Sequence, residues 1–381
     1  MPNYDAASHR VLNNGKALQK GGHEVSFISW GGAYREEDLC EDGKYRIAGM
    51  EYMISGEIDN KGSFFSRMGS IIRRGEKSIN ILNNLKKQPD VIILYNASRG
   101  WTNSMISYCR NNKITLVSDI TEWYDNNELY FFQRLPNWLN MIFTQKKLKN
   151  KIVISSYLDK LYSLSHNIIL PPLCDMTEAK WDKAKPDARV NTFAGITLIY
   201  AGTPAKKDCL HTVINVVNKL IKEGHNVRFL ILGAEKESYL SKYKQLIYTG
   251  ELHENILFLG RIPHDFIPAY YKMADFMVLL REPTRKNMAG FPTKVAESLT
   301  AGVPVITNRT SDLGKYIVPS KNGYLLEAES FDELYSCLND TVLSLSRRQI
   351  NEMKEKAKES SVIFDYNTYI DPLNKFIESL I

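Results

Sequence analysis

Short, almost wholly apolar segments alternate with longer amphipathic segments through most of the chain. The clearest apolar segments are VIILYN (91–96), TLIYAG (197–202), VRFLILG (227–233), DFMVLL (275–280) and VPVITN (303–308). Continuous apolar runs of this length are typical of strands buried on both faces, as in a parallel sheet. Helices between such strands give βαβ units and cover both faces of the sheet. The pattern therefore predicts an α/β fold.

The alternation falls into two series, and 381 residues are enough for two domains of ordinary size. We expect an N-terminal Rossmann-like domain over 1–175 and a C-terminal one over 196–366, facing each other across a cleft. Residues 176–195 show little periodicity and are expected to form the linker. The apolar spacing within 367–381 predicts a last helix that crosses back to the N-terminal domain.

The first predicted helix, which ends at Gly21 and Gly22, has no strand before it. A doubly wound domain normally begins with a strand that lies centrally in its sheet. Two explanations remain open. Either the sequence starts late, or the N-terminal domain lacks its first strand and has backbone edges that need cover.

Composition and charge narrow the class of protein. The content of 21 Tyr, 15 Phe and 5 Trp is ample for folded cores and excludes intrinsic disorder. The net charge of +6 is mild for this length, and we expect no nucleic-acid partner. The five cysteines are scattered without a CxxC or Cys/His cluster, so neither a zinc site nor a disulfide framework is expected. No apolar run of spanning length occurs, and a reducing cytoplasm fits best.

Two segments combine basic and large apolar residues. Residues 134–151 carry five basic residues and no acid, and 64–87 carry six basic residues against Glu76 alone. Either segment could be a solvated helix face over a buried one, or a surface that binds an anionic membrane. We therefore expect a cytoplasmic protein that is peripheral on the inner face of the plasma membrane.

The chemistry concentrates in 281–312. Gly290 permits a tight turn after a strand, and Pro292 suits the first turn of a helix. Thr293 and Lys294 then lie at that helix N-terminus, where free N–H groups and the dipole favour an anion. Glu297 lies four residues beyond Thr293 on the same face. A phosphate at the helix tip and a carboxylate one turn further would match a nucleoside diphosphate. An amphipathic helix with a surface Lys294–Glu297 pair is the plainer alternative.

The segment AGFPTKVAESLTAGVPVIT (289–307) resembles the donor-site signature of the family 4 retaining glycosyltransferases, or glycosyl transferases group 1, of GT-B fold. The resemblance extends to IYAGTPAKKD (199–208), NILFLGRIP (255–263) and ADFMVLLR (274–281). DITEWYD (119–125) is similar to the acidic-aromatic loop of polysaccharide-assembly members. The segment PNYDAASHRVLNNGKALQKGGHEV (2–25) resembles the family's first loop and helix, and the resemblance also includes ISSYL…ILPPLCD (154–175). Together the matching segments are spread over most of the chain and are closest to enzymes that build bacterial capsules, exopolysaccharides or O-antigens.

The resemblance implies roles for particular residues. Glu297 matches the second glutamate of a paired motif and would hold the donor ribose. Lys207 would neutralise the diphosphate, and Gly202 would let the pyrophosphate approach. Arg261 and Ile262 fall where the backbone meets the nucleobase. The loop over the donor sugar and pyrophosphate would be Gly290, Phe291, Pro292, Thr293 and Lys294.

Two positions depart from the family pattern. The first glutamate of the paired motif would fall at Ala289, which leaves the identity of the donor sugar, and activity itself, open. The arginine that often follows the glycine of the phosphate loop is replaced by Thr203. Arg281 or Arg285 could supply that charge, since both follow the strand that ends at 280.

Catalysis would follow from the charge of the leaving group. Negative charge grows on the diphosphate as the sugar–phosphate bond breaks, and Lys207, Lys294 and the helix N-terminus can stabilise it. No D-x-D triplet occurs, so no metal is expected. The resemblance alone implies retention by front-face attack, with the leaving phosphate assisting. Asp119 and Glu122, three apart at a strand end, are candidates for an acceptor-side pair; loop capping is the alternative for both.

Three functions fit these observations. The leading prediction is a hexosyltransferase-type glycosyltransferase that uses a UDP- or GDP-sugar and a glycan or lipid-linked acceptor, with Glu297, Lys207, Asp119 and Glu122 as catalytic candidates. A nucleotide-sugar 2-epimerase on the same scaffold needs no lipid acceptor. A non-catalytic, nucleotide-binding assembly subunit would account for Ala289.

Overall fold

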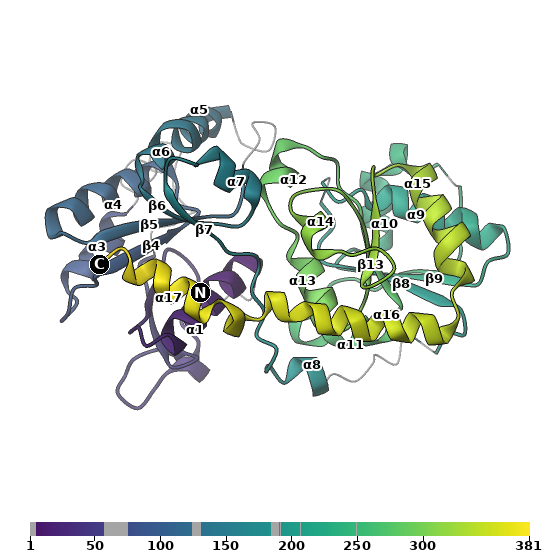
Figure 1. The fold of residues 1–381 in the computed structure, drawn as a ribbon, viewed down its shortest axis with the longest axis horizontal. Helices are drawn as coiled ribbons and strands as arrows, with labels where there is room; N and C mark the ends of the chain where they lie inside the picture. The colour runs from purple at the N-terminus through teal and green to yellow at the C-terminus, as the bar shows by residue number, and fades with distance from the viewer. Residues whose placement is uncertain are drawn as a thin grey trace. The chain divides into compact units, whose positions relative to one another are not determined.

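A computed structural model describes residues 5–56, 75–123, 131–183, 190, 192–205, 207–248 and 250–381. The chain divides into two compact units. The first unit comprises Met1–Leu173 and Tyr366–Ile381, and the second comprises Cys174–Asp365. Both are layered α/β units with parallel strands (Figure 1), which confirms the predicted fold class.

The second unit is built on one six-stranded sheet with the order β10-β9-β8-β11-β12-β13, in which every pair is parallel. Its strands are β8 (Ile196–Ala201), β9 (Val227–Leu232), β10 (Ile256–Phe258), β11 (Phe276–Leu279), β12 (Val305–Asn308) and β13 (Gly323–Leu326). Its helices are α8 (Lys180–Lys183), α9 (Leu210–Lys222), α10 (Lys236–Lys242), α11 (Ile267–Met273), α12 (Arg285–Ala289), α13 (Thr293–Thr300), α14 (Leu313–Tyr316), α15 (Phe331–Ser336) and α16 (Arg347–Ser360). All residues of β8, β9, β11 and β12 are buried, as their apolar runs predict.

The first unit holds two sheets, with the orders β1-β3-β2 and β4-β5-β6-β7. Its strands are β1 (Ser26–Ser29), β2 (Arg46–Ile47), β3 (Met50–Ile54), β4 (Val91–Tyr95), β5 (Thr115–Ile120), β6 (Asn150–Val153) and β7 (His166–Ile169). Its helices are α1 (Ala6–Lys20), α3 (Glu76–Asn83), α4 (Arg99–Asn112), α5 (Phe131–Leu139), α6 (Gln145–Lys147), α7 (Ser156–Leu161) and α17 (Ile370–Glu378). The question of a strand before α1 concerns residues 1–4, which lie outside the described residues.

The two sheets of the first unit share their helical cover, although β1 and β4 are the end strands of different sheets. Val25, next to β1, packs on the same cluster as Val91 and Ile93 of β4. On the other face Ile28 of β1 joins the cluster that contains Leu94. The side chains thus form one layered core across a boundary where the described strands do not pair.

Strands β2 and β3 form a tight hairpin. Ala48 and Gly49 both have positive φ, of 49° and 78°, between β2 and β3. Ile47 pairs with Met50 across this two-residue turn, and the two strands run antiparallel. Positive φ at both central positions is what a two-residue hairpin with right-handed twist requires.

The last helix belongs to the first unit. Leu373, Phe376 and Ile377 of α17 pack in one cluster with Ala17 and Leu18 of α1, and Figure 1 shows the two helices together. These residues recur at helical spacing, so they present one apolar face. Among the residues that the structure describes, no helix combines the length and the apolar character that crossing a membrane requires.

Candidate functional site

The second unit has a topological switch point between β8 and β11. The chain winds outward from β8 through β9 to β10, and then returns to the other side of β8 with β11. In open parallel sheets the carboxyl ends of the strands at such a point leave a crevice where ligands bind. The residues that follow these two ends are Gly202 after β8 and Arg281 after β11, both predicted site residues.

Glycines let the backbone close tightly beside this point. Gly202 has a φ of 126°, and a Cβ there would lie 2.5 Å from Cε of Lys294. Gly233, with a φ of 95°, faces Gly202 so closely that a Cβ would lie 2.5 Å from its carbonyl carbon and oxygen. Neither position accommodates a larger residue without movement, because L side chains rarely adopt these angles. Lys294 is therefore held directly against the end of β8.

Asp208 gathers the charged residues of the site. Its side chain is 1% exposed, and its Oδ1 accepts from Nε of Arg281 at 2.7 Å and lies 2.7 Å from Nη2. Its Oδ2 accepts from Nζ of Lys294 at 2.6 Å and from the Tyr200 hydroxyl at 2.6 Å. Lys294 also donates to the Tyr200 hydroxyl at 2.8 Å. One buried carboxylate thus holds two cations side by side.

The electrostatics of this cluster leave an excess of positive charge. Burial opposes ionisation of Asp208, but the charges of Lys294 and Arg281 outweigh it and hold the pKa of the carboxyl well below its usual range. Burial lowers the pKa of Lys294, Asp208 raises it, and Arg281 and Lys207 lower it further. Lys207 is therefore close enough to act on Lys294. Three cations against one carboxylate make a site for an anion of more than one charge.

Backbone contacts fix Arg281 in this position. Its N–H donates to Oδ1 of Asn308 at 2.8 Å, and Nδ2 of Asn308 donates to its carbonyl at 2.7 Å. The N–H of Cys209 donates to the carbonyl of Leu280 at 2.8 Å, which ties the start of α9 to the end of β11. Arg285, the alternative source of the charge, is exposed on α12.

The helix α13 begins at Thr293, as the sequence predicts, with Pro292 at its N-cap and no capping side chain. Lys294 lies in its first turn and Glu297 one turn further. Oε1 of Glu297 lies 3.5 Å from Nε2 of His264, and both side chains are about a quarter exposed. The structure thus adds His264 as a neighbour of the predicted ribose carboxylate.

The other predicted residues of the second unit line the approach to α13 or lie in the loop after β10. Phe291 is buried, with its ring 5.3 Å from that of Tyr316 and 5.9 Å from that of Phe364, so its side chain serves the core. Gly290 forms the junction between α12 and α13. Arg261 is exposed and Ile262 half-buried in the loop that leads to His264.

Asp119 and Glu122 belong to the first unit, whereas the charged cluster belongs to the second. The Asp119 carboxylate is buried and accepts from Nη2 of Arg10 at 2.8 Å, from Nε at 3.0 Å, and from Nδ2 of Asn14 at 3.2 Å. Nη1 of Arg10 donates to the carbonyl of Leu170 at 3.0 Å. These contacts engage the Asp119 carboxylate in holding α1 on the sheet, whereas Glu122 is half-buried beyond β5.

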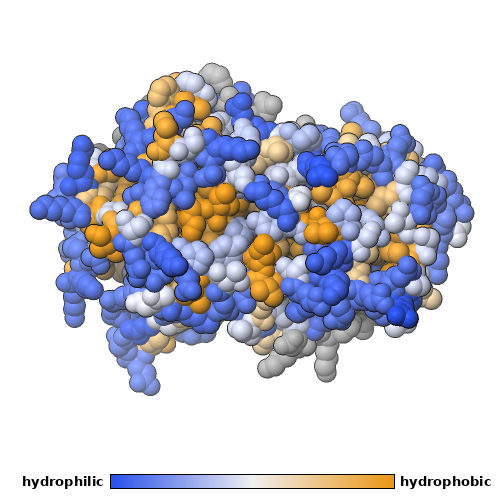
Figure 2. All heavy atoms as spheres, viewed as in Figure 1, coloured by the Kyte–Doolittle hydropathy of each residue, from blue (hydrophilic) through white to orange (hydrophobic). Residues whose placement is uncertain are grey.

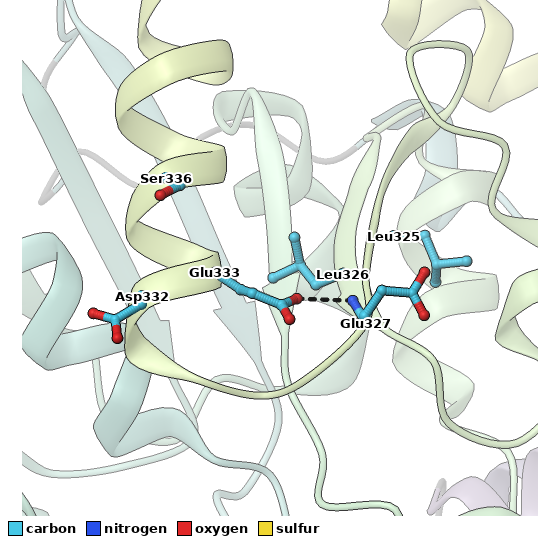
Figure 3. Close-up of a pocket in the computed structure, with 6 residues that line it drawn as sticks. All are labelled: Leu325, Leu326, Glu327, Asp332, Glu333 and Ser336. Carbon is cyan, nitrogen blue, oxygen red and sulfur yellow. Dashed lines mark hydrogen bonds between the residues drawn. The ribbon is translucent and has the colours of Figure 1, made fainter.

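A depression at the end of β13, drawn in Figure 3, has none of the residues of the charged cluster in its lining. It is lined by Leu325, Leu326, Glu327, Asp332, Glu333 and Ser336. Its central carboxylate, Glu333, accepts from the backbone N–H of Glu327 at 2.8 Å and of Ala328 at 3.0 Å. Glu333 therefore closes the loop before α15. The lining offers no cation for a phosphate.

Sequence reasoning did not single out Asp208, Tyr200 or His264 as site residues. Asp208 directly follows Lys207, but nothing local marks it as buried, because its cationic partners lie 73 and 86 residues away. Within the described ranges, no group of three or more His, Cys, Asp and Glu side chains is arranged to hold a metal. All five cysteines are free.

Comparison with known proteins gives one family for the second unit. Residues 191–360 match the family model of Glycosyl transferases group 1, and they contain every member of the charged cluster. This match spans most of the second unit but less than half of the chain, and it supports the glycosyltransferase that the resemblance implied. A search of curated proteins gives no significant match.

Solved structures match the fold over nearly the whole chain. Sucrose-phosphate synthase from Thermosynechococcus elongatus is 12% identical with a TM-score of 0.72, over 97% of this chain and 92% of that one. A glycosyltransferase from Rickettsia africae is 14% identical with a TM-score of 0.69, over 99% and 96%. Anabaena Alr3699/HepE, in complex with UDP and glucose, is 14% identical with a TM-score of 0.66, over 93% and 99%. These likenesses support the GT-B fold.

Proposed function

We propose that this protein transfers a sugar, with retention, from a nucleotide-sugar donor to a glycan or lipid-linked acceptor in bacterial surface polysaccharide synthesis. One observation carries the donor assignment: Arg281, Lys294 and Lys207 gather around Asp208 at the switch point of the second unit. A diphosphate matches the excess of positive charge there. The acceptor and the polysaccharide role rest on the resemblance of 119–125 to polysaccharide-assembly members of family 4, whose donor-site signature 289–307 resembles.

The cluster would act on the leaving group. As the sugar–phosphate bond breaks, charge grows on the diphosphate, and preorganised cations in a partly buried site stabilise it without reorganising. Lys294 and Arg281 are held ready by Asp208, and Lys207 adds a third charge. We propose that these residues suffice without a metal, so that a chelator leaves turnover unchanged.

UDP is the first nucleotide to test. Anabaena Alr3699/HepE, a structural neighbour, is described in complexes with UDP and glucose and with UDP-glucose. GDP remains the alternative base. In either case Glu297 is proposed to accept from both ribose hydroxyls, with His264 beside it.

Glu297→Gln is expected to weaken binding of UDP and of uridine about tenfold or more while the fold stays intact. An amide accepts at one oxygen only, and the loss of one charge-assisted hydrogen bond costs about 1.5–3 kcal/mol. Calorimetric titration of both ligands measures this. Glu355→Gln, on an exposed face of α16, is the matched control and should bind as the wild type does. Unchanged affinity in Glu297→Gln would refute the ribose assignment.

The activity itself is tested in two steps. A thermal-shift screen of nucleotide sugars identifies the donor, since a ligand that binds only the native state raises apparent stability. Product analysis with and without a chelator then separates three functions. Sugar on an acceptor supports the transferase, an altered sugar still attached to the nucleotide indicates the 2-epimerase, and binding without turnover indicates the assembly subunit.

We propose further that residues 134–151 attach the first unit to an anionic membrane. Leu135, Trp138 and Phe143 are exposed, at 63%, 45% and 50%, and Figure 2 shows apolar side chains on the surface over α5. Three basic residues that follow them in the chain are exposed as well: Lys146, Lys147 and Lys149. Exposed aromatic and basic residues together suit the interface of an anionic bilayer.

Part of the sequence prediction for this surface is corrected. Lys151 is buried in β6, where it donates to the Ser165 hydroxyl at 2.5 Å, so it is no part of a basic surface. Met141 is buried as well. The companion segment 64–87 lies outside the described residues as far as 74, and in α3 Leu82 is buried.

Vesicle sedimentation tests the membrane proposal. The wild type should bind vesicles that contain phosphatidylglycerol, and binding should fall at raised salt because screening weakens its electrostatic part. Exchanging both Trp138 and Phe143 for Ser should abolish binding. Leu164→Ser, which alters a fully exposed apolar residue of the same unit, is the control. Equal binding of the double variant and the control would exclude this surface.

A further inference from the structure

We propose that Asp208 is a positioning residue of the diphosphate site, which keeps Lys294 and Arg281 aligned and Lys294 charged. This inference rests on the proposed function. Asp208 touches neither sugar nor phosphate in this scheme, because both of its oxygens are engaged by the two cations and by Tyr200. It acts on the ligand through the residues it holds.

Without Asp208 the two cations would repel each other. Lys294 and Arg281 reach the same carboxylate from two different elements, Lys294 from α13 and Arg281 from the end of β11. Like charges this close in a partly buried site disfavour each other, and the ammonium can lower its charge by losing a proton, whereas a guanidinium cannot. Lys294 is therefore the group whose charge depends on Asp208.

The surroundings of Lys294 strengthen this dependence. Its side chain is 15% exposed, its Nζ lies 4.5 Å from the centre of the Tyr200 ring, and Gly202 closes the space beside Cε. The titratable groups that act on Lys294 directly are Asp208 before α9, Arg281 after β11, Lys207 after β8 and Tyr200 on β8. Behind them Tyr239 of α10 acts on Tyr200 and Asp208, and the Tyr271 hydroxyl of α11 lies 3.5 Å from the Lys294 carbonyl. Of these groups, Asp208 is the one carboxylate.

Asp208→Asn tests the proposal, with UDP, inorganic pyrophosphate and uridine titrated at pH 7, 8 and 9. We expect at least a tenfold loss of affinity for UDP and pyrophosphate at pH 7. The loss should grow as pH rises, because Lys294 now gives up its proton at lower pH than in the wild type. Uridine, which carries no phosphate, should bind as before.

Asp275→Asn is the matched control. Asp275 is also buried in the second unit, next to β11, but at the opposite end of that strand, where it pairs with Arg347 at 2.7 Å. This variant should show the affinity and pH profile of the wild type. If Asp208→Asn has the same pH profile as the wild type, even with a constant offset, the role is merely structural and the proposal is overturned.

Two further outcomes are distinguishable. If the wild type binds pyrophosphate but no nucleotide, the nucleotide-sugar function fails, while the pyrophosphate titrations still decide the role of Asp208. If Asp208→Asn does not fold, Asp208→Glu retains the charge but displaces it by one methylene. It should then lose affinity for pyrophosphate about fivefold or more while keeping the wild-type pH profile, and unchanged affinity would overturn the proposal.

Discussion

Lys294→Met should weaken UDP binding about 10- to 150-fold and leave uridine binding unchanged. The ammonium is expected to give one charge-assisted contact to the diphosphate, and such contacts are worth about 1.5–3 kcal/mol. Met preserves most of the side-chain volume beside Gly202, so the close approach of backbone and side chain is retained. Isothermal titration of both ligands gives the two affinities directly.

Two comparisons make this result specific. Lys207→Ala should likewise weaken UDP much more than uridine, because Lys207 belongs to the same group of charges. Lys356→Met, which alters an exposed lysine of α16, should leave both affinities as they are. Parallel losses of UDP and uridine in Lys294→Met would instead indicate a general disturbance of the second unit.

Arg10→Met should lower the unfolding free energy of the first unit by about 3–5 kcal/mol. Removing one partner of a buried ion pair leaves the other charge uncompensated, which is the costly case. Arg10 is 4% exposed and Asp119 is 2% exposed, so the loss of Arg10 leaves the charge of Asp119 buried without its cationic partner. Tryptophan fluorescence during urea unfolding measures this, because Trp30, Trp101, Trp123 and Trp138 lie in the first unit and Trp181 alone in the second.

A second variant separates anchoring from catalysis at Asp119. Exchanging Arg10 for Met and Asp119 for Leu together should recover much of the lost stability, since apolar replacements of buried pairs are often tolerated. The acceptor-side role predicted for Asp119 makes a different demand. If Asp119 acts in catalysis, Asp119→Asn should abolish turnover while the variant keeps nearly the stability of the wild type. That result would count against a purely anchoring role.

The sequence predicted the strands of the second unit well, because a strand that is buried on both faces consists almost wholly of apolar residues. The runs 197–202, 227–233, 275–280 and 303–308 correspond to β8, β9, β11 and β12. The start of α13 at Thr293 could also be predicted, since glycine and proline mark it locally. Family resemblance then supplied the interpretation that periodicity alone left open.

What the sequence could not show are contacts between distant residues. In the sequence, Asp208 looks like an ordinary loop carboxylate next to two lysines. Its contacts with Arg281 and Lys294 form only in the folded unit, where β8 and β11 pair in parallel. Lys151 reads as one of five basic residues on a surface, yet its strand carries it inward. In both cases burial of a charge depends on partners that no local pattern encodes.

The divided sheet of the first unit has a consequence for its response to temperature. The described strands β1 and β4 do not pair through hydrogen bonds. The two sheets are therefore held together there by the packing of Val25, Ile28 and their apolar neighbours. Apolar contacts weaken on cooling and strengthen with excluded salts, unlike ion pairs such as Arg10–Asp119. This seam is therefore where the protein should loosen first in the cold, and where sulfate, rather than low ionic strength, would tighten it.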